Sequence, residues 1–306
     1  MVHIDTQLKI SKAAKRSWLF AAIFSLVQPG ILASAIEAQP AHPPTQTASF
    51  PSGPLSPSST MDAGYSDMYN LDFDGAHKTF QVWERSHPGD PMGPTSEAAA
   101  DLFWQFNQMH VLESDLFLDD DQFFYRQAPG PDQLVRARFE REIARAENLA
   151  DKRLAAAPDD TNALFAEVLD AGMEGDYAAM VENRYLASLA YVKRSGRLAE
   201  KLLALDPSCY DAYLAIGVEN YILSLSPMPV RWLLDLYGAQ TDQKTGIEKL
   251  KLTAASGHYL EPYARVLLAV AALRGHDRDR AKQLLQGLVR QFPHNQLYAR
   301  ELARLQ

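Results

Sequence analysis

The residues best suited to hold a metal ion lie close together in the first half of the chain. His110 and Glu113 have the spacing of one helix face, and Asp115 and the run Asp119–Asp121 follow soon after. Imidazole and carboxylate groups together could bind a divalent cation. Only one histidine is nearby, however, and the acidic run lacks the glycine and the terminal glutamate of a calcium loop. The pattern favours a solvated loop, so we expect no metal site and no cofactor.

Motifs that mark common enzymes do not occur anywhere in the chain. The sequence contains no H-E-x-x-H, G-x-S-x-G, Walker or G-x-G-x-x-G pattern. Cys209 is the only cysteine, so no intramolecular disulfide can form, and it is expected to be a small buried hydrophobic residue. We therefore expect a binding protein and not an enzyme.

Polar and aromatic side chains that could contact a partner occur in three places. Such residues line the grooves in which helical repeats hold extended or helical peptides. The alternative is that the tyrosines are half-buried packing residues and that the segment around Trp232 packs inward. The candidate partner-binding residues are Asn183, Arg184, Tyr185, Glu219, Asn220, Tyr221, Arg231 and Trp232.

The elements that must position these residues are helices. After residue 60 there is no convincing alternating strand pattern, and apolar residues recur three and four positions apart, as in Leu198, Leu202 and Leu205. Long helices are expected near residues 132–156 and 178–205. Such apolar stripes indicate faces buried against neighbouring helices.

Four of these helices end at a proline in a polar turn, because proline cannot continue a helix but suits the turn into the next one. The four are Pro88, Pro158, Pro207 and Pro293. The residues twelve, eight and five positions before each proline form a similar series. The first is small, as expected where two helices cross closely, and the next two are expected to fill the space between the helices. The series are Ala76, Phe80, Trp83; Ala146, Ala150, Arg153; Ser195, Ala199, Leu202; and Ala281, Leu285, Leu288.

Two glycines, Gly64 and Gly217, occupy matching positions inside predicted helices. Glycine costs about 1 kcal/mol relative to alanine in a helix, so close helix contact is its expected reason. This arrangement resembles the tetratricopeptide repeat of about 34 residues. The resemblance implies an all-α, right-handed solenoid of about five antiparallel helix pairs, irregular because the prolines stand 70, 49 and 86 residues apart.

A further resemblance lies in residues 223–260. Ser224-Leu225-Ser226-Pro227 leads to the apolar stretch Trp232-Leu233-Leu234, and Asp242, Gly246 and Leu250 follow. This insert is similar to that of the Iml2 / tetratricopeptide repeat protein 39 family and its bacterial relatives. The resemblance extends over about residues 205–305 and implies an inserted short helix and a scaffold or adaptor role.

The N-terminus has the layout of an export signal. Four basic residues precede the apolar run 17–28, and Ala33-Ser34-Ala35 supplies a cleavage pattern, so residues 1–38 are predicted to be a signal peptide or an uncleaved anchor. Residues 39–60 are rich in proline, serine and threonine and are predicted to be a disordered linker. The repeat domain is then expected over residues 61–306. The location is periplasmic or secreted, or membrane-anchored facing the periplasm.

The net charge of the chain further restricts the kinds of partner that it is expected to bind. The whole chain carries a formal charge of −8, and removal of residues 1–38 leaves 26 basic and 36 acidic residues. A protein this acidic lacks the excess of basic residues that binding to nucleic acid or to an anionic membrane surface requires. We expect an exported scaffold that binds a protein or peptide partner. The alternative is a protein that binds a small molecule or an envelope polymer in an interior cavity under the 225–242 insert.

Overall fold

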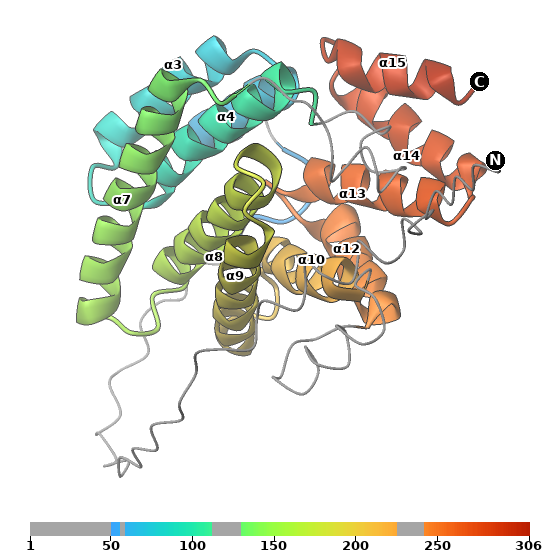
Figure 1. Ribbon diagram of the computed structural model, residues 1–306. Coiled ribbons are helices and arrows are strands. Elements are labelled where there is room, and N and C mark those ends of the chain that lie inside the picture. Colours follow the sequence, from blue (N-terminus) through green and yellow to red (C-terminus); the bar gives the residue numbers. More distant parts are fainter. Residues whose placement is uncertain (1–49, 56–58, 112–129, 225–241) are drawn as a thin grey trace, which may run out of the picture.

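The computed structural model describes residues 50–55, 59–111, 130–224 and 242–306, and every regular element within them is helical (Figure 1). The α-helices are α2 (Thr60–Tyr69), α3 (Phe73–Ser86), α4 (Met92–Gln108), α7 (Gln133–Ala156), α8 (Thr161–Asp176), α9 (Tyr185–Leu205), α10 (Tyr213–Ser224), α12 (Gln243–Ser256), α13 (Glu261–Arg274), α14 (Arg278–Gln291) and α15 (Gln296–Arg304). A π-helical turn, η2 (Tyr177–Val181), follows α8, and a 3-10 turn, η3 (Tyr210–Ala212), precedes α10. The prediction of an all-α fold is confirmed for these residues.

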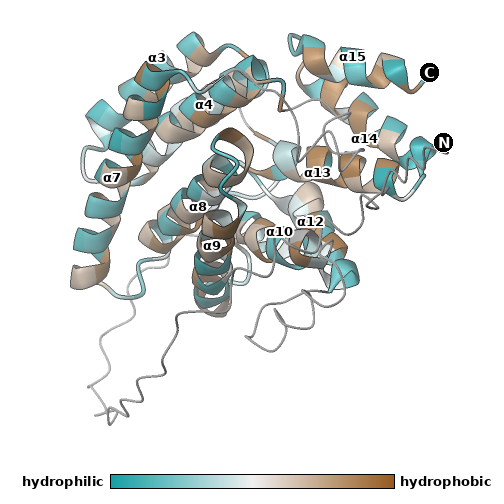
Figure 2. Cartoon of the chain, in the orientation of Figure 1, coloured by the Kyte–Doolittle hydropathy of each residue, from teal (hydrophilic) through white to brown (hydrophobic). Residues whose placement is uncertain are grey.

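The helices pack in consecutive pairs. The pairs are α2 with α3, α4 with α7, α8 with α9, α10 with α12 and α13 with α14. Each pair also contacts the next pair along the chain, and α15 packs on α14. Hydrophilic and hydrophobic residues alternate along the labelled helices, as expected when one face of each helix is buried (Figure 2). The prediction of about five pairs therefore holds in the described part of the chain.

The four proline turns share one geometry, with proline in the second position of a hydrogen-bonded turn. In each, the N–H group two residues after the proline donates to the carbonyl group of the residue before it. These bonds run from Asp90 to His87 (3.0 Å), Asp160 to Ala157 (3.0 Å), Cys209 to Asp206 (3.2 Å) and Asn295 to Phe292 (3.1 Å). The side chains of Asp160 and Asn295 then cap the helix that follows. Each turn therefore ends one helix and begins the next.

Small residues stand where helices approach closely. Ala76, Ala146, Ser195 and Ala281, the first members of the four series, are all buried. A Cβ atom on Gly64 would overlap the ring of Phe80.

Gly217 lies in an equally tight contact between α10 and α12. A Cβ atom on Gly217 would lie 2.9 Å from Cγ of Leu250, and one on Gly246 would lie 2.6 Å from the backbone nitrogen of Tyr221. Close helix contact is thus the reason for both predicted glycines, Gly64 and Gly217.

The two long helices differ in how well they follow prediction. The helix expected near 132–156 is α7, but the one expected near 178–205 is divided, because residues 182–184 separate η2 from α9. Asn183 adopts a φ of 56°, in the left-handed region that asparagine tolerates better than most residues. The N–H of Arg184 donates to the carbonyl of Ala178 at 2.7 Å and stabilises this break.

Residues 50–55, which we call the N-terminal strap, pack against the helices although they fall within the predicted linker. The ring of Phe50 meets that of Phe165 on α8 edge-on at 5.2 Å. The N–H of Gly53 donates to the carbonyl of Ser256 (3.2 Å), and Nδ1 of His258 lies 2.9 Å from the carbonyl oxygen of Gly53. Within the described residues, the part of the predicted linker from Phe50 to Leu55 thus belongs to the folded domain.

Helix α2 of the first pair also contacts the turns that lead into α13 and α15 at the other end of the array. The hydroxyl of Tyr69 on α2 donates to the carbonyl of Tyr259 at 2.8 Å, and the amide of Asn295 donates to the carbonyl of Tyr69 at 2.7 Å. Nε2 of His258 lies 2.9 Å from a carboxylate oxygen of Asp62. These bonds span about two hundred residues of sequence, so the two ends of the array meet.

Several predicted segments lie outside the described residues. They are the signal peptide 1–38, the first part of the linker, the acidic run at 119–121 and the insert up to residue 241. Among the helices that are described, none has both the length and the hydropathy needed to span a membrane.

Candidate functional site

The three predicted groove residues of α10 are buried. Glu219, Asn220 and Tyr221 expose 7%, 2% and 6% of their surface. The amide of Asn220 donates to the carbonyl of Ile216 (3.0 Å), and its oxygen accepts the N–H of Asp242 (3.3 Å). Asn220 thus holds the residue that caps α12. A Cβ atom on Gly196 would overlap the carboxylate of Glu219, so this side chain packs tightly against α9.

The other predicted partner residues lie elsewhere. Asn183 and Arg184 are exposed and Tyr185 is partly exposed, at the break between η2 and α9. The guanidinium of Arg184 pairs with Glu182 at 2.9 Å, and the hydroxyl of Tyr185 donates to the side chain of Asn183 at 3.2 Å. Arg231 and Trp232 fall outside the described residues, as do Glu113, Asp115 and Asp119–Asp121.

A cavity of about 80 Å³ lies at the centre of the array. The first helix of every pair contributes to its wall, namely α2, α4, α8, α10 and α13, together with two residues of α9. The wall is mainly apolar, with a few polar groups. The polar groups and tyrosines that line it are Tyr65, Tyr69, Asp176, Ser195, Asp211 and Tyr263.

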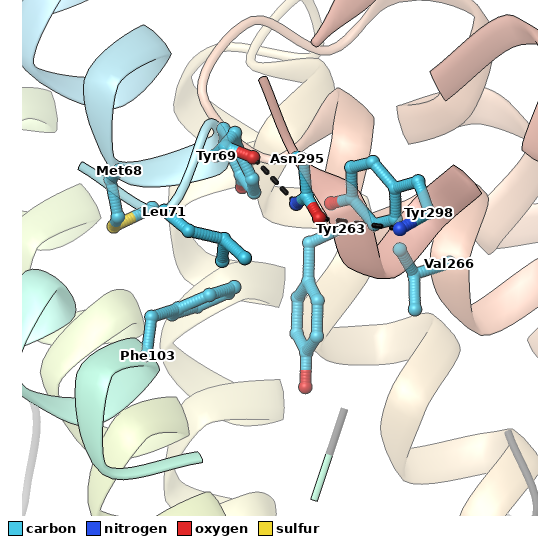
Figure 3. Close-up of a pocket in the computed structure, with 8 residues that line it drawn as sticks. All are labelled: Met68, Tyr69, Leu71, Phe103, Tyr263, Val266, Asn295 and Tyr298. Carbon is cyan, nitrogen blue, oxygen red and sulfur yellow. Dashed lines mark hydrogen bonds between the residues drawn. The ribbon is translucent and has the colours of Figure 1, made fainter. Parts of the chain in front are cut away.

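A second cavity of about 20 Å³, roughly the space of one water molecule, adjoins the first. The two share Met68, Tyr69 and Tyr263 in their walls. Figure 3 shows the second cavity, where Tyr263 is one of the lining residues and its hydroxyl points away from Asn295 and Tyr298. Tyr263 thus lines both cavities, and its hydroxyl is directed toward Asp176 in the wall of the larger one.

Asp176 is the carboxyl group that the cavity leaves least compensated. It is the last residue of α8, and one carboxylate oxygen accepts the hydroxyl of Tyr263 at 3.1 Å. Burial raises the pKa of Asp176 to about 6, and the bond from Tyr263 only partly opposes this. No arginine, lysine or histidine in the described part of the chain pairs with it. At pH 7 Asp176 is thus mostly an anion among apolar and aromatic groups.

Asp211 also faces the cavity, but its charge is well compensated. Its two oxygens accept the backbone N–H groups of His258 (2.8 Å), Tyr259 (3.0 Å) and Leu260 (3.1 Å) just before α13. Burial raises the pKa of Asp211, and these three bonds act against the rise. The start of a helix favours a nearby negative charge. Asp211 therefore holds the chain in place just before α13 begins and has a structural role.

The densest cluster of ionisable side chains lies between α3, α4 and α7, away from the cavity lining. Nδ1 of His77 bonds Glu97, its Nε2 lies 3.2 Å from Asp101, and Arg138 pairs with Asp101 through two nitrogens. Burial lowers the pKa of His77, but the bonds and charges of the two carboxylates outweigh it and raise the value to about 9. Two cations thus balance two anions, and the cluster joins three helices.

The described residues offer no support for a metal site or for a reactive thiol. No group of three or more histidine, cysteine or acidic side chains there has an arrangement that could hold a metal ion. Cys209 is buried, as predicted, and burial raises the pKa of its thiol far above the ordinary value. A thiol so strongly protonated is a poor nucleophile.

The cavity residues were not foreseen from the sequence, although a signal exists. Residues 161–181 read as an apolar helix interrupted by four acidic residues, Glu167, Asp170, Glu174 and Asp176. Two of these carboxyl groups accept hydroxyl groups from other helices: Asp170 accepts that of Thr95 at 2.9 Å, and Asp176 accepts that of Tyr263. An acidic residue on the buried face of a helix is uncommon enough to mark a candidate site.

Comparisons with known proteins give no relatives: no family model matches the chain, and no significant match is found among characterised proteins or solved structures. The case for function therefore depends on the geometry described above.

Proposed function

We propose that this chain is an exported, non-enzymatic binding protein that holds a small organic molecule in its central cavity. The fold proposed with this function is a right-handed, tetratricopeptide-like solenoid of antiparallel pairs, related to the bacterial relatives of the Iml2 / tetratricopeptide repeat protein 39 family. The four matching proline turns and the close glycine contacts support that part of the proposal.

One observation carries the ligand assignment: the first helices of all five pairs converge on a single cavity. In an open solenoid the concave face offers a long groove to a peptide. Here the bonds of Tyr69, Asn295 and His258 join α2 to the turns before α13 and α15, and aromatic rings fill the interior. The remaining space of about 80 Å³ is near half of the roughly 150 Å³ cavity that accommodates benzene in another protein. A space of this size suits a small molecule or the end of a larger one.

The experiment is to express the full chain with its own leader in a Gram-negative host and record native mass spectra of the exported protein. A co-purified small molecule, or one retained from a library of small metabolites, supports the proposal. Ala215→Leu adds three carbon atoms to the cavity wall and should abolish retention. Ala204→Leu, on the exposed side of α9, is the matched control and should retain the ligand. Equal retention by both variants would refute the cavity as the binding site.

A protein or peptide scaffold is the second candidate, and the N-terminal strap favours it. Its sequence Phe-Pro-Ser-Gly-Pro-Leu docks on α8 and α12 through one aromatic anchor and two backbone contacts. The array can therefore hold a proline-containing segment that lacks regular secondary structure. A pull-down from envelope extract that recovers the same partner with wild type and with Ala215→Leu would favour this role over the cavity.

Export is tested separately from binding. Cleavage after the Ala33-Ser34-Ala35 pattern predicts a mature protein that begins close to residue 36. The intact mass and the N-terminal sequence of the protein from the periplasmic fraction measure this directly. A full-length chain in the membrane fraction would instead indicate an uncleaved anchor.

A further inference from the structure

The charge inside the central cavity restricts what the cavity can hold. Two carboxyl groups face it, Asp176 and Asp211. Asp211 is neutralised by three backbone N–H groups, whereas Asp176 receives one hydroxyl bond, from Tyr263. That bond uses Oδ2 of Asp176, and within the described residues Oδ1 has no donor. Asp176 is partly buried, and a carboxylate that faces a cavity with one oxygen free of protein donors and no cation beside it favours a ligand that supplies a positive charge and N–H donors.

The rest of the wall suits the apolar part and the charge of the same ligand. Tyr65, Tyr69 and Tyr263 contribute aromatic rings, and Met68 and Met173 contribute flexible thioether side chains. Aromatic faces attract organic cations, most strongly where water is excluded. Methionine adapts its shape to an irregular apolar group. The cavity thus combines one anion, several aromatic rings and apolar contacts.

We infer that the cavity binds a small organic cation, an alkylamine or the ammonium end of a larger molecule, with its N–H groups on Asp176 and its carbon chain among the tyrosines and methionines. This inference rests on the proposed function, since it names the ligand class of the same cavity. The volume of about 80 Å³ limits the enclosed part to a few carbon atoms beside the ammonium group.

Two probes of nearly equal shape test the ligand class. Isobutylammonium and isobutanol differ mainly in charge, and their binding to the full mature chain can be compared by NMR titration at pH 7.5. A charge-assisted hydrogen bond is worth about 1.5–3 kcal/mol, so the amine should bind about 10- to 100-fold more tightly than the alcohol. Asp176→Asn should remove this preference. Asp74→Asn, which removes the same charge from an exposed position on α3, should retain it.

The outcomes separate the two proposals. Equal affinity for both probes would refute the ligand class and leave the cavity as a site for neutral molecules. Failure of both probes to bind would also contradict the proposed function. A preference that survives in Asp176→Asn would show that another group recognises the cation.

A second measurement needs no variant. The titratable groups that line the cavity are Asp176, Asp211, Tyr65, Tyr69 and Tyr263, and the tyrosines stay neutral throughout the range because burial raises their pKa values. The preference for the amine should therefore weaken about 10-fold per pH unit once Asp176 is protonated, below about pH 6. A preference that stays constant from pH 7.5 to pH 4.5 would overturn the inference.

Discussion

At the scale of single residues, the ionised side chain of Asp176 is a candidate binding group that lowers the free energy of unfolding. Its folded pKa of about 6 exceeds the ordinary value of 3.8, so between these two values the folded chain holds more protons than the unfolded chain. The free energy of unfolding must therefore fall as pH rises from about 4 to about 6. Above pH 6 the partly buried anion remains a constant cost to the free energy of unfolding.

Asp176→Asn is expected to remove that cost while keeping an acceptor for Tyr263. The shift of about 2 pKa units corresponds to at most about 3 kcal/mol, and solvent near the cavity reduces it, so we expect a gain of about 1–2 kcal/mol at pH 7.5. Urea denaturation between pH 4 and 8 measures both the gain and the loss of pH dependence. Asp74→Asn should change the free energy of unfolding by less than about 0.5 kcal/mol. A decrease for Asp176→Asn would show that the carboxylate stabilises the fold.

His77 has the same sign of pH dependence as Asp176, but here the fold favours the charged form and not the neutral one. Its folded pKa of about 9 lies above the ordinary value of 6.5, so its contribution is fully present below pH 6.5 and is lost as pH rises through 9. In His77→Gln we expect the free energy of unfolding to be lower by about 1–3 kcal/mol at pH 6, with a flatter profile from pH 6.5 to 9. Thermal denaturation across this range measures it. His294→Gln, at an exposed position, should keep the wild-type profile.

At the scale of elements, the contact between α10 and α12 depends on two glycines that face each other. A Cβ on Gly246 would lie 3.0 Å from the carbonyl oxygen of Gly217, in addition to its contact with Tyr221. Since backbone atoms cannot give way as side chains do, Gly246→Ala should lower the free energy of unfolding by about 2–4 kcal/mol. Gly287→Ala is the control, because its Cβ meets only the guanidinium of Arg265 at 3.5 Å. That change should stabilise α14 by up to about 1 kcal/mol; similar losses for both variants would contradict the argument.

These same elements mark how far the sequence alone could lead. The proline turns, the glycines Gly64 and Gly217 and the boundaries of α7 were predictable, because each depends on residues close together in the chain. The break at Asn183 and the packing of the strap were not, because both depend on contacts with other parts of the fold. An interior cavity was among the predicted alternatives, but its lining residues were not predicted for the same reason: Asp176 and Tyr263 are 87 residues apart, and no local pattern connects them.

At the scale of the whole molecule, contact between α2 and the turns before α13 and α15 should make unfolding more cooperative than in an open repeat array. In open arrays each repeat touches only its neighbours, so the ends unfold first. Here Asn295 both caps α15 and donates to the carbonyl of Tyr69. Asn295→Asp keeps the capping oxygen and removes the donor, so it separates these two roles.

For Asn295→Asp we expect a loss of about 1–3 kcal/mol, because a buried carbonyl is left facing a carboxylate. Hydrogen exchange of α2 should become faster together with that of α15. Asp277→Asn also keeps a cap, that of α14, without any bond to the first pair, and should leave exchange in α2 unchanged. Exchange in α2 that does not respond to Asn295→Asp would show that the contact between the two ends contributes little.

The meeting of the two ends has a consequence for how this architecture can change during evolution. An open solenoid lengthens by duplication of a unit, since a new pair only has to stack on its neighbours. In this chain an added pair would separate Asn295 from Tyr69 and His258 from Asp62, and it would leave the aromatic interior exposed. Duplication is thus penalised while substitution inside the cavity is not. Such a protein should diversify by exchanging wall residues at a fixed number of repeats.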